Sequence, residues 1–144
     1  MTRELPTSLL MFISSRFAAD RIFGAVHAAG FDDVTIAQSR LLMGIDPGGT
    51  RVSVLAARAQ IAKQTATSLV AKLERAGYVE RVPDPSDGRA TLVRLTARAE
   101  SALPIARAEE DRIEAEWRGH LGARGMDQLR RHLSALRDIT DAYR

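Results

Sequence analysis

The sequence contains no cysteine among its 144 residues. Without a thiol, the chain has no disulfide, no thiolate nucleophile, no cysteine metal ligand and no direct thiol sensor. Any sensing or catalysis by this protein therefore depends on other side chains.

Long apolar runs are missing as well. No stretch approaches the ~18 uninterrupted apolar residues that read as a membrane-spanning helix. The apolar run Leu9–Ile13 is short, and Arg16 and Asp20 interrupt the sequence after it, so residues 1–30 do not resemble a signal peptide. These absences predict a cytoplasmic protein with no membrane partner. The length predicts a single domain, residues 1–144, which is long enough to bury a core.

The motifs of common enzyme chemistry are also absent. The sequence has no GxSxG nucleophile elbow and no GxxxxGK[ST] phosphate loop. Glu116 and His120 are four residues apart, but two ligands do not make a zinc site. We therefore expect no catalytic residue, no metal and no cofactor, and a small helical enzyme is the least favoured of the functional classes considered.

Positive charge is concentrated in the middle of the chain. The net charge is +3, but residues 51–98 hold nine Lys or Arg and four Asp or Glu, an excess of +5, while each flank has a net charge of −1. A local basic patch indicates a polyanion as partner, because neutralised phosphates release their counterions.

Residues 63–75 have the pattern of an amphipathic helix. Ala66, Leu69, Val70 and Leu73 form one apolar stripe. Away from the stripe lie short hydrogen-bonding and cationic side chains of the kinds that read bases in the DNA major groove. The candidate contacts are Lys63, Gln64, Thr65, Thr67, Ser68 and Lys72. A solvated face on an ordinary helix is the alternative interpretation.

The next stretch predicts a β-hairpin. Gly77 ends the helix, residues 78–82 and 90–95 are strand-like, and residues 83–89 form a turn rich in Pro, Asp and Gly. Arg89 near the tip is suited to the DNA minor groove, with the Asp87 carboxylate supporting its geometry. The alternative is an exposed ion pair of little energetic weight.

Residues 69–96, LVAKLERAGYVERVPDPSDGRATLVRLT, resemble the signature of the MarR (multiple-antibiotic-resistance regulator) family. The resemblance implies a mostly α-helical fold with a small β-wing, in which a winged helix-turn-helix is joined to a dimerisation region. It also implies a homodimer that binds double-stranded DNA at an inverted repeat, usually as a repressor and often released by a small molecule. Two positions depart from the family: Ala62 where a Ser cap is usual, and Ala97–Ala99 where a glycine is common.

Helical patterns flank the winged module, which we assign to residues 35–97. Residues 6–29 are apolar around most of the helix, Pro104 predicts that the helix over residues 98–118 bends or begins late, and residues 119–125 predict a turn. Residues 126–143 repeat apolar positions every three or four residues, a seam for another helix. We expect residues 6–30 and 98–144 to form a dimerisation region shared by two chains.

Several local features carry further predictions. Thr35 and Gln38 have the spacing of a capping box, Thr7 or Ser8 is predicted to cap the first helix, and Ser53 is predicted to cap the helix that precedes residues 63–75. Residues 50–52 are predicted to add a third strand to the wing.

The functional prediction is a sequence-specific transcriptional regulator, with a non-specific architectural DNA-binding protein as the alternative. By the family resemblance, an effector would bind near the first helix. There Phe12 and Phe17 offer an aromatic floor and Arg16 a cation for an acidic aromatic compound, although a core or interface role explains these residues equally well.

Overall fold

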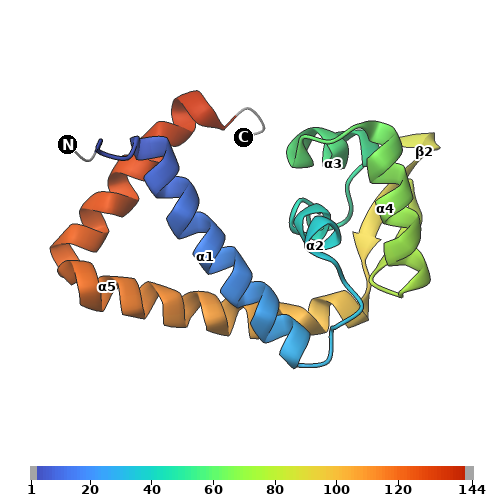
Figure 1. The fold of residues 1–144 in the computed structure, drawn as a ribbon. Coiled ribbons are helices and arrows are strands. Elements are labelled where there is room, and N and C mark those ends of the chain that lie inside the picture. Colours follow the sequence, from blue (N-terminus) through green and yellow to red (C-terminus); the bar gives the residue numbers. More distant parts are fainter. Residues whose placement is uncertain (1–2, 142–144) are drawn as a thin grey trace.

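The computed structural model describes residues 3–141 and shows a mostly helical chain with a two-stranded wing (Figure 1). The predicted fold class is confirmed. In chain order the elements are α1 (Thr7–Ala28), α2 (Ile36–Met43), α3 (Val52–Ala59), α4 (Lys63–Arg75), β1 (Val79–Asp84), β2 (Asp87–Leu95) and α5 (Ala97–Thr140). We call residues 36–95 the winged lobe, and α1 with α5 the helical arm.

The core lies in the winged lobe. Ala66, Val70 and Leu73 of the predicted stripe on α4 are buried, and Leu69 is half-buried against the same cluster. The other buried members come from α2, α3, the wing and the start of α5: Leu41, Leu55, Ala56, Tyr78, Val79, Val93 and Ala99. Because one side of α4 is anchored in this way, its opposite side is held outward.

Helix starts follow the predictions in part. The capping box of Thr35 and Gln38 on α2 is confirmed. The prediction for Ser53 is wrong: α3 already begins at Val52, so Arg51 occupies the cap position and no side chain caps it. The predictions for Thr7 and Ser8 are also wrong, because Pro6 occupies the cap position of α1 and Thr7 is already its first helical residue.

The wing is a tighter hairpin than the sequence predicts. β1 and β2 are antiparallel, and pairing continues from Val79↔Leu95 to Asp84↔Asp87, so only residues 85 and 86 form the turn. Pro83 is tolerated because the register shifts between it and Asp84. The predicted third strand is reduced to one bridge, in which the backbones of Thr50 and Val93 exchange hydrogen bonds of 2.9 and 2.8 Å.

α5 is a long helix with one break. It starts at Ala97, capped by the Thr96 hydroxyl, and continues through Pro104, so the late start allowed for that helix is wrong. The predicted turn over residues 119–125 is reduced to Gly122, where φ is 78° and ψ is 157°. Arg118 spans this break, since its guanidinium donates to the Ala123 carbonyl at 3.3 Å and to Asp127 at 3.0 Å.

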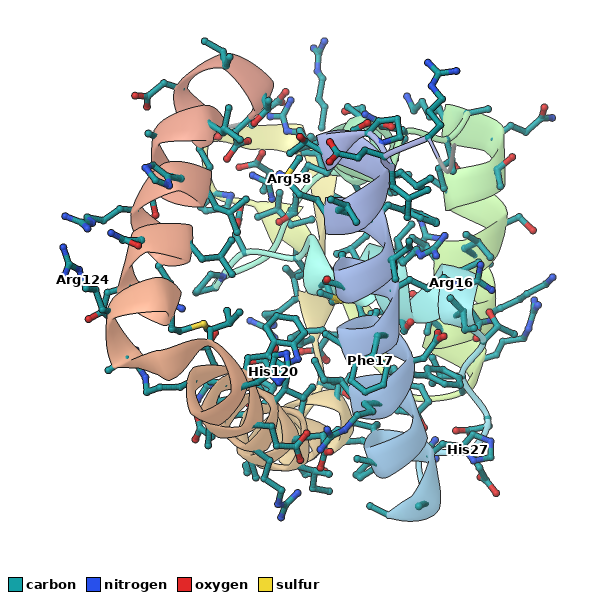
Figure 2. The ribbon with its side chains drawn as sticks, turned by 60° about the vertical axis from the view of Figure 1, so that its left-hand side comes forward. Arg16, Phe17, His27, Arg58, His120 and Arg124 are labelled. Carbon is teal, nitrogen blue, oxygen red and sulfur yellow. The ribbon has the colours of Figure 1, made fainter. Side chains whose placement is uncertain are left out.

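The helical arm has an open shape. α1 and the part of α5 after Gly122 rise on the same side of the longer part of α5 (Figures 1 and 2). Arg21 of α1 holds the two helices together by donating to Glu109 at 2.7 Å and also to Glu116. No residue of α1 is buried. Tyr143, predicted to close the apolar seam of α5, lies outside the described residues, and within them no helix is long and apolar enough to cross a membrane.

Candidate nucleic-acid interface

The outward side of α4 carries the predicted contact residues. All six candidates on this helix are exposed: Lys63, Gln64, Thr65, Thr67, Ser68 and Lys72. Among them, the Thr67 hydroxyl donates to the Lys63 carbonyl at 2.9 Å, which leaves its methyl group and oxygen lone pairs available. The sequence pattern therefore placed these side chains on the face of α4 that the structure leaves exposed.

The start of α4 has no side-chain cap. Ala62 occupies the cap position with extended backbone angles and, as the sequence predicts, offers no acceptor to the first turn. Amide groups at the start of a helix attract anions, because they are unsatisfied and lie at the positive end of the helix dipole. Lys63 adds a positive charge at the same end.

Ion pairs divide the basic residues of this region into two sets. Within residues 51–98, five arginines have acidic partners within 4 Å: Arg51, Arg58, Arg81, Arg94 and Arg98. For Lys63, Lys72, Arg75 and Arg89 the structure shows no ion pair with any described residue, and all four are exposed on α4 or near the wing tip. The cations of this region without an ion pair to a described residue therefore all lie on α4 or near the wing tip.

Arg75 belongs to this second set, although the contact prediction omitted it. The helical wheel had already placed it on the outward face with Gln64 and Ser68. What the sequence did not show was which neighbouring arginines are neutralised by acids. The available sequence signal was therefore the position of Arg75 on the outward face, and the structure adds that it forms no ion pair within residues 3–141.

The wing tip differs in one detail from the prediction. One carboxylate oxygen of Asp87 accepts a hydrogen bond from the backbone amide of Arg89 at 3.1 Å. The second lies 3.8 Å from the guanidinium of Arg51. Asp87 thus supports the backbone of Arg89 rather than its guanidinium, because the turn folds the carboxylate onto the amide two residues ahead.

Sequence reasoning missed a hydrogen-bond network beside the turn of the wing. Arg51, at the start of α3, donates two hydrogen bonds of 2.9 and 2.7 Å to the buried carboxylate of Asp84. Ser86 donates to the other oxygen of Asp84 from its amide at 2.9 Å and its hydroxyl at 2.7 Å. The bonds from Ser86, followed by those from Arg51, lower the pKa of Asp84 to about 2. This network fixes the wing against α3.

A groove of about 690 Å³ lies between the helical arm and the winged lobe. Phe12 and Arg16 line it, but Phe17 does not, and the ring of Phe17 instead lies 5.8 Å from the Arg21 guanidinium. Figure 2 shows Arg16 on the side of α1 that faces the lobe and Phe17 on a different side. Most of the lining is apolar and comes from α1, the α1–α2 loop, α2, the corner between α4 and β1, the end of β2 and α5: Phe12, Phe23, Val26, Phe31, Val34, Leu42, Tyr78, Leu95 and Leu103.

Two arginines stand at this groove without an acidic partner among the described residues. Arg40 comes from α2 and Arg107 from α5, so they approach from the lobe and from the arm. Apolar walls with a few charged groups are typical of small-molecule sites. The lining also holds two carboxylates, Asp20, which lies 3.9 Å from Arg16, and Glu110, so the anion-attracting groups are the guanidinium groups of Arg40 and Arg107.

Glu116, one of the two residues considered as metal ligands, forms an ion pair with Arg21. The carboxylate of Glu116 accepts hydrogen bonds from Arg21, and His120 lies near the bend of α5 (Figure 2). Among residues 3–141, no three His, Cys, Asp or Glu side chains are grouped as metal ligands.

The sequence is similar to a family model and to a curated transcriptional regulator of the helix-turn-helix type. The sequence model described as the MarR family matches residues 32–90. The HTH-type transcriptional regulator BilQ of Clostridioides difficile (strain CD3) is 28% identical over 87 residues, 58% of this chain and 56% of BilQ, so the match spans about half of that curated relative.

Solved structures match over more of the chain. The crystal structure of transcriptional regulator PA4135 is 25% identical, with a TM-score of 0.68, over 94% of this chain and 99% of that one. Wild-type apo MarR from E. coli is 21% identical, with a TM-score of 0.72, over 94% and 98% of the two chains, a likeness of fold.

Proposed function

We propose that this chain is a MarR-family transcriptional regulator that acts in the cytoplasm, because its winged lobe matches the MarR-family sequence model over residues 32–90. It binds a pseudo-palindromic DNA site as a homodimer, represses transcription there, and releases the DNA when a small anionic molecule binds. The relatives named as transcriptional regulators support this proposal.

One observation carries the DNA-binding proposal. The cations of residues 51–98 that lack an acidic partner among the described residues are confined to α4 and the wing, whereas the others form ion pairs with acids of the chain. A solvated helix face would not separate its charges in this way. Phosphate contacts supply most of the affinity for DNA, so a concentrated set of available cations marks the docking surface.

Sequence preference is assigned to polar and cationic side chains on the outward face of α4. Gln64 is suited to adenine, Lys63 and Lys72 to guanine or phosphate, and the methyl groups of Thr65 and Thr67 to thymine. Arg89 enters the neighbouring minor groove from the wing. With α4 in the major groove, two lobes related by a two-fold axis would read half-sites about 34 Å apart, one turn of B-form DNA.

The dimer proposal rests on apolar surface that a single chain leaves uncovered. Leu133, Leu136 and Ile139 are 39%, 37% and 84% exposed at the end of α5, and α1 exposes a further set: Leu9, Leu10, Met11, Phe12, Ile13 and Phe17. Large exposed apolar patches mark association surfaces. Residues 6–30 and 98–144 are therefore assigned to dimerisation.

Effector release is assigned to the groove between arm and lobe. Its apolar walls and the guanidinium groups of Arg40 and Arg107 favour an aromatic acid. Because the arm and the lobe both line the groove, a ligand with different affinities for two arm–lobe arrangements would shift the balance between them.

The experiment begins with selection of DNA from a random pool by the purified full-length protein, followed by competition against unrelated duplex at fixed salt. The proposal expects an inverted repeat and a preference of about a thousandfold or more over random duplex. Equal affinity for both duplexes would identify a non-specific architectural protein. Addition of aromatic carboxylates to the complex then tests release.

A further inference from the structure

One cluster of side chains joins the winged lobe to the helical arm. The chain passes between these two parts at the loop from α1 to α2, which contains Asp33, and at the junction of β2 and α5, which contains Thr96 and Arg98. Tyr78, at the corner between α4 and β1, lies against both. The α1–α2 loop, the junction of β2 and α5, and the end of α4 therefore meet around Tyr78.

Arg98 makes three kinds of contact there. Its guanidinium carbon lies 4.3 Å from the centre of the Tyr78 ring. One guanidinium nitrogen donates to both oxygens of Asp33, at 3.2 and 3.1 Å, and the other donates to the carbonyl of Ala76, which ends α4. Arg98 of α5 thus contacts the ring of Tyr78, the carboxylate of Asp33 and the backbone carbonyl at the end of α4.

The groups around Arg98 are themselves fixed. Tyr78 is 2% exposed and its hydroxyl donates to Asp33. The Thr96 amide donates to the Tyr78 carbonyl at 3.0 Å, and the Thr96 hydroxyl to the Gly77 carbonyl at 2.5 Å. Burial, followed by the hydrogen bond to Asp33, raises the pKa of Tyr78 to about 12, so the phenol stays protonated as a donor at neutral pH.

An exposed ion pair would have little effect by itself. Here the same guanidinium also stacks on a buried ring and binds a backbone carbonyl, so the planar shape of arginine is used as well as its charge. The other arginine pairs of the lobe, such as Arg94 with Glu80 across the wing strands and Arg81 with Glu74 of α4, stay within the lobe and do not reach the arm.

We propose that Arg98 is a positioning residue that fixes the angle between the winged lobe and α5, and thereby sets the distance between half-sites at which the dimer binds. The inference rests on the proposed function, because it requires two lobes on one DNA site. Arg98 itself does not read bases. It holds the end of α4 against the helical arm, and in the proposed dimer this arm pairs with the arm of the chain that bears the second lobe.

The test uses the full-length protein and the selected operator with zero, one or two base pairs inserted between the half-sites. Each inserted pair rotates one half-site by about 34° and shifts it by about 3.4 Å. A rigid dimer loses affinity steeply over this series, by about tenfold or more for the first pair. In Arg98→Ala the loss for the same insertion is expected to shrink to about threefold or less, because the lobes reorient, while base preference within each half-site is unchanged.

Matched variants separate positioning from general damage. Arg112→Ala removes an α5 arginine that pairs with Glu109 within the arm, and it should keep the wild-type spacing profile. Arg98→Lys keeps the charge but lacks the planar fork, so a profile between wild type and Arg98→Ala is expected, and this variant carries the test if Arg98→Ala does not fold.

The outcomes distinguish the two proposals. If the wild type binds only as well as it binds random duplex, or shows no preferred spacing, the proposed function fails. If the wild type is sensitive to spacing and the Arg98 variants are equally sensitive, the positioning role is wrong and the proposed function stands.

Discussion

Replacement of Arg89 by alanine tests the charge assignment quantitatively. Each lobe presents four cations without an acidic partner among the described residues, namely Lys63, Lys72, Arg75 and Arg89, so a dimer presents eight. If all eight neutralise phosphates, the slope of log K against log salt is about −7, and removal of two cations per dimer reduces it to about −5.4.

The difference between these slopes is large enough to measure. Between 50 and 200 mM salt, the wild-type affinity should fall by about 2 × 10⁴-fold and that of Arg89→Ala by about 2 × 10³-fold. The defect of the variant is therefore about twelvefold greater at the lower salt concentration. Fluorescence anisotropy with a labelled operator, repeated at four or more salt concentrations, gives both slopes.

Arg94 is the matched control. It lies on the same strand as Arg89, but its guanidinium is 2.6 Å from the carboxylate of Glu80. Arg94→Ala should leave the slope near the wild-type value, because that charge is already balanced. The reasoning is refuted if Arg89→Ala keeps the wild-type slope, or if both variants lower it equally.

Three further predictions concern assembly, pH and stability. Leu133→Asp should convert the dimer to a monomer by light scattering and weaken operator binding by about a hundredfold, since the second lobe loses its tether; Ser134→Asp is the neighbouring control, and a monomer that binds as tightly as wild type would contradict the coupling. Asp84 has its pKa lowered to about 2 in the folded protein, so it contributes stability above its unfolded pKa of about 4 that is lost as the pH falls toward 2. In urea titrations across that range, Asp84→Asn should flatten the acid loss, and an unchanged pH dependence would exclude the assigned role. Ala62→Ser should raise the free energy of unfolding by about 1 kcal/mol, because the hydroxyl caps the first turn of α4, and the absence of a gain in chemical denaturation would contradict that account.

The parts of the fold that were predictable from sequence are local. The stripe on α4, the capping box on α2 and the hairpin after Gly77 depend on residues a few positions apart, whose geometry the chain fixes. The outward position of the DNA-contact candidates follows from the same periodicity.

The parts that were not predictable depend on distant partners. Arg51 meets Asp84 across 33 positions, and Arg98 meets Asp33 across 65, so no spacing rule reveals either pair. Charge counting alone gave each basic residue of the region equal weight. Only the folded chain separates cations that stabilise the lobe from those that remain available to DNA.

The break in α5 also failed to follow from spacing. Three glycines at positions 119, 122 and 125 offered equal opportunities for a turn, and the chain uses the middle one while the other two stay helical. Arg118 contributes to that choice by bonding to residues beyond the break.

In the proposed dimer, the arrangement of the two chains consequently depends on the backbone conformation of Gly122. An unbroken helix over the 44 residues of α5 would extend about 66 Å as a straight rod. At Gly122 the φ of 78° is one that side-chain-bearing residues rarely adopt. A residue with a Cβ there would favour straightening, and the leucines beyond the bend would then face a different direction from α1. Two chains altered in this way would no longer match each other's surfaces, even though every contact residue remained in place.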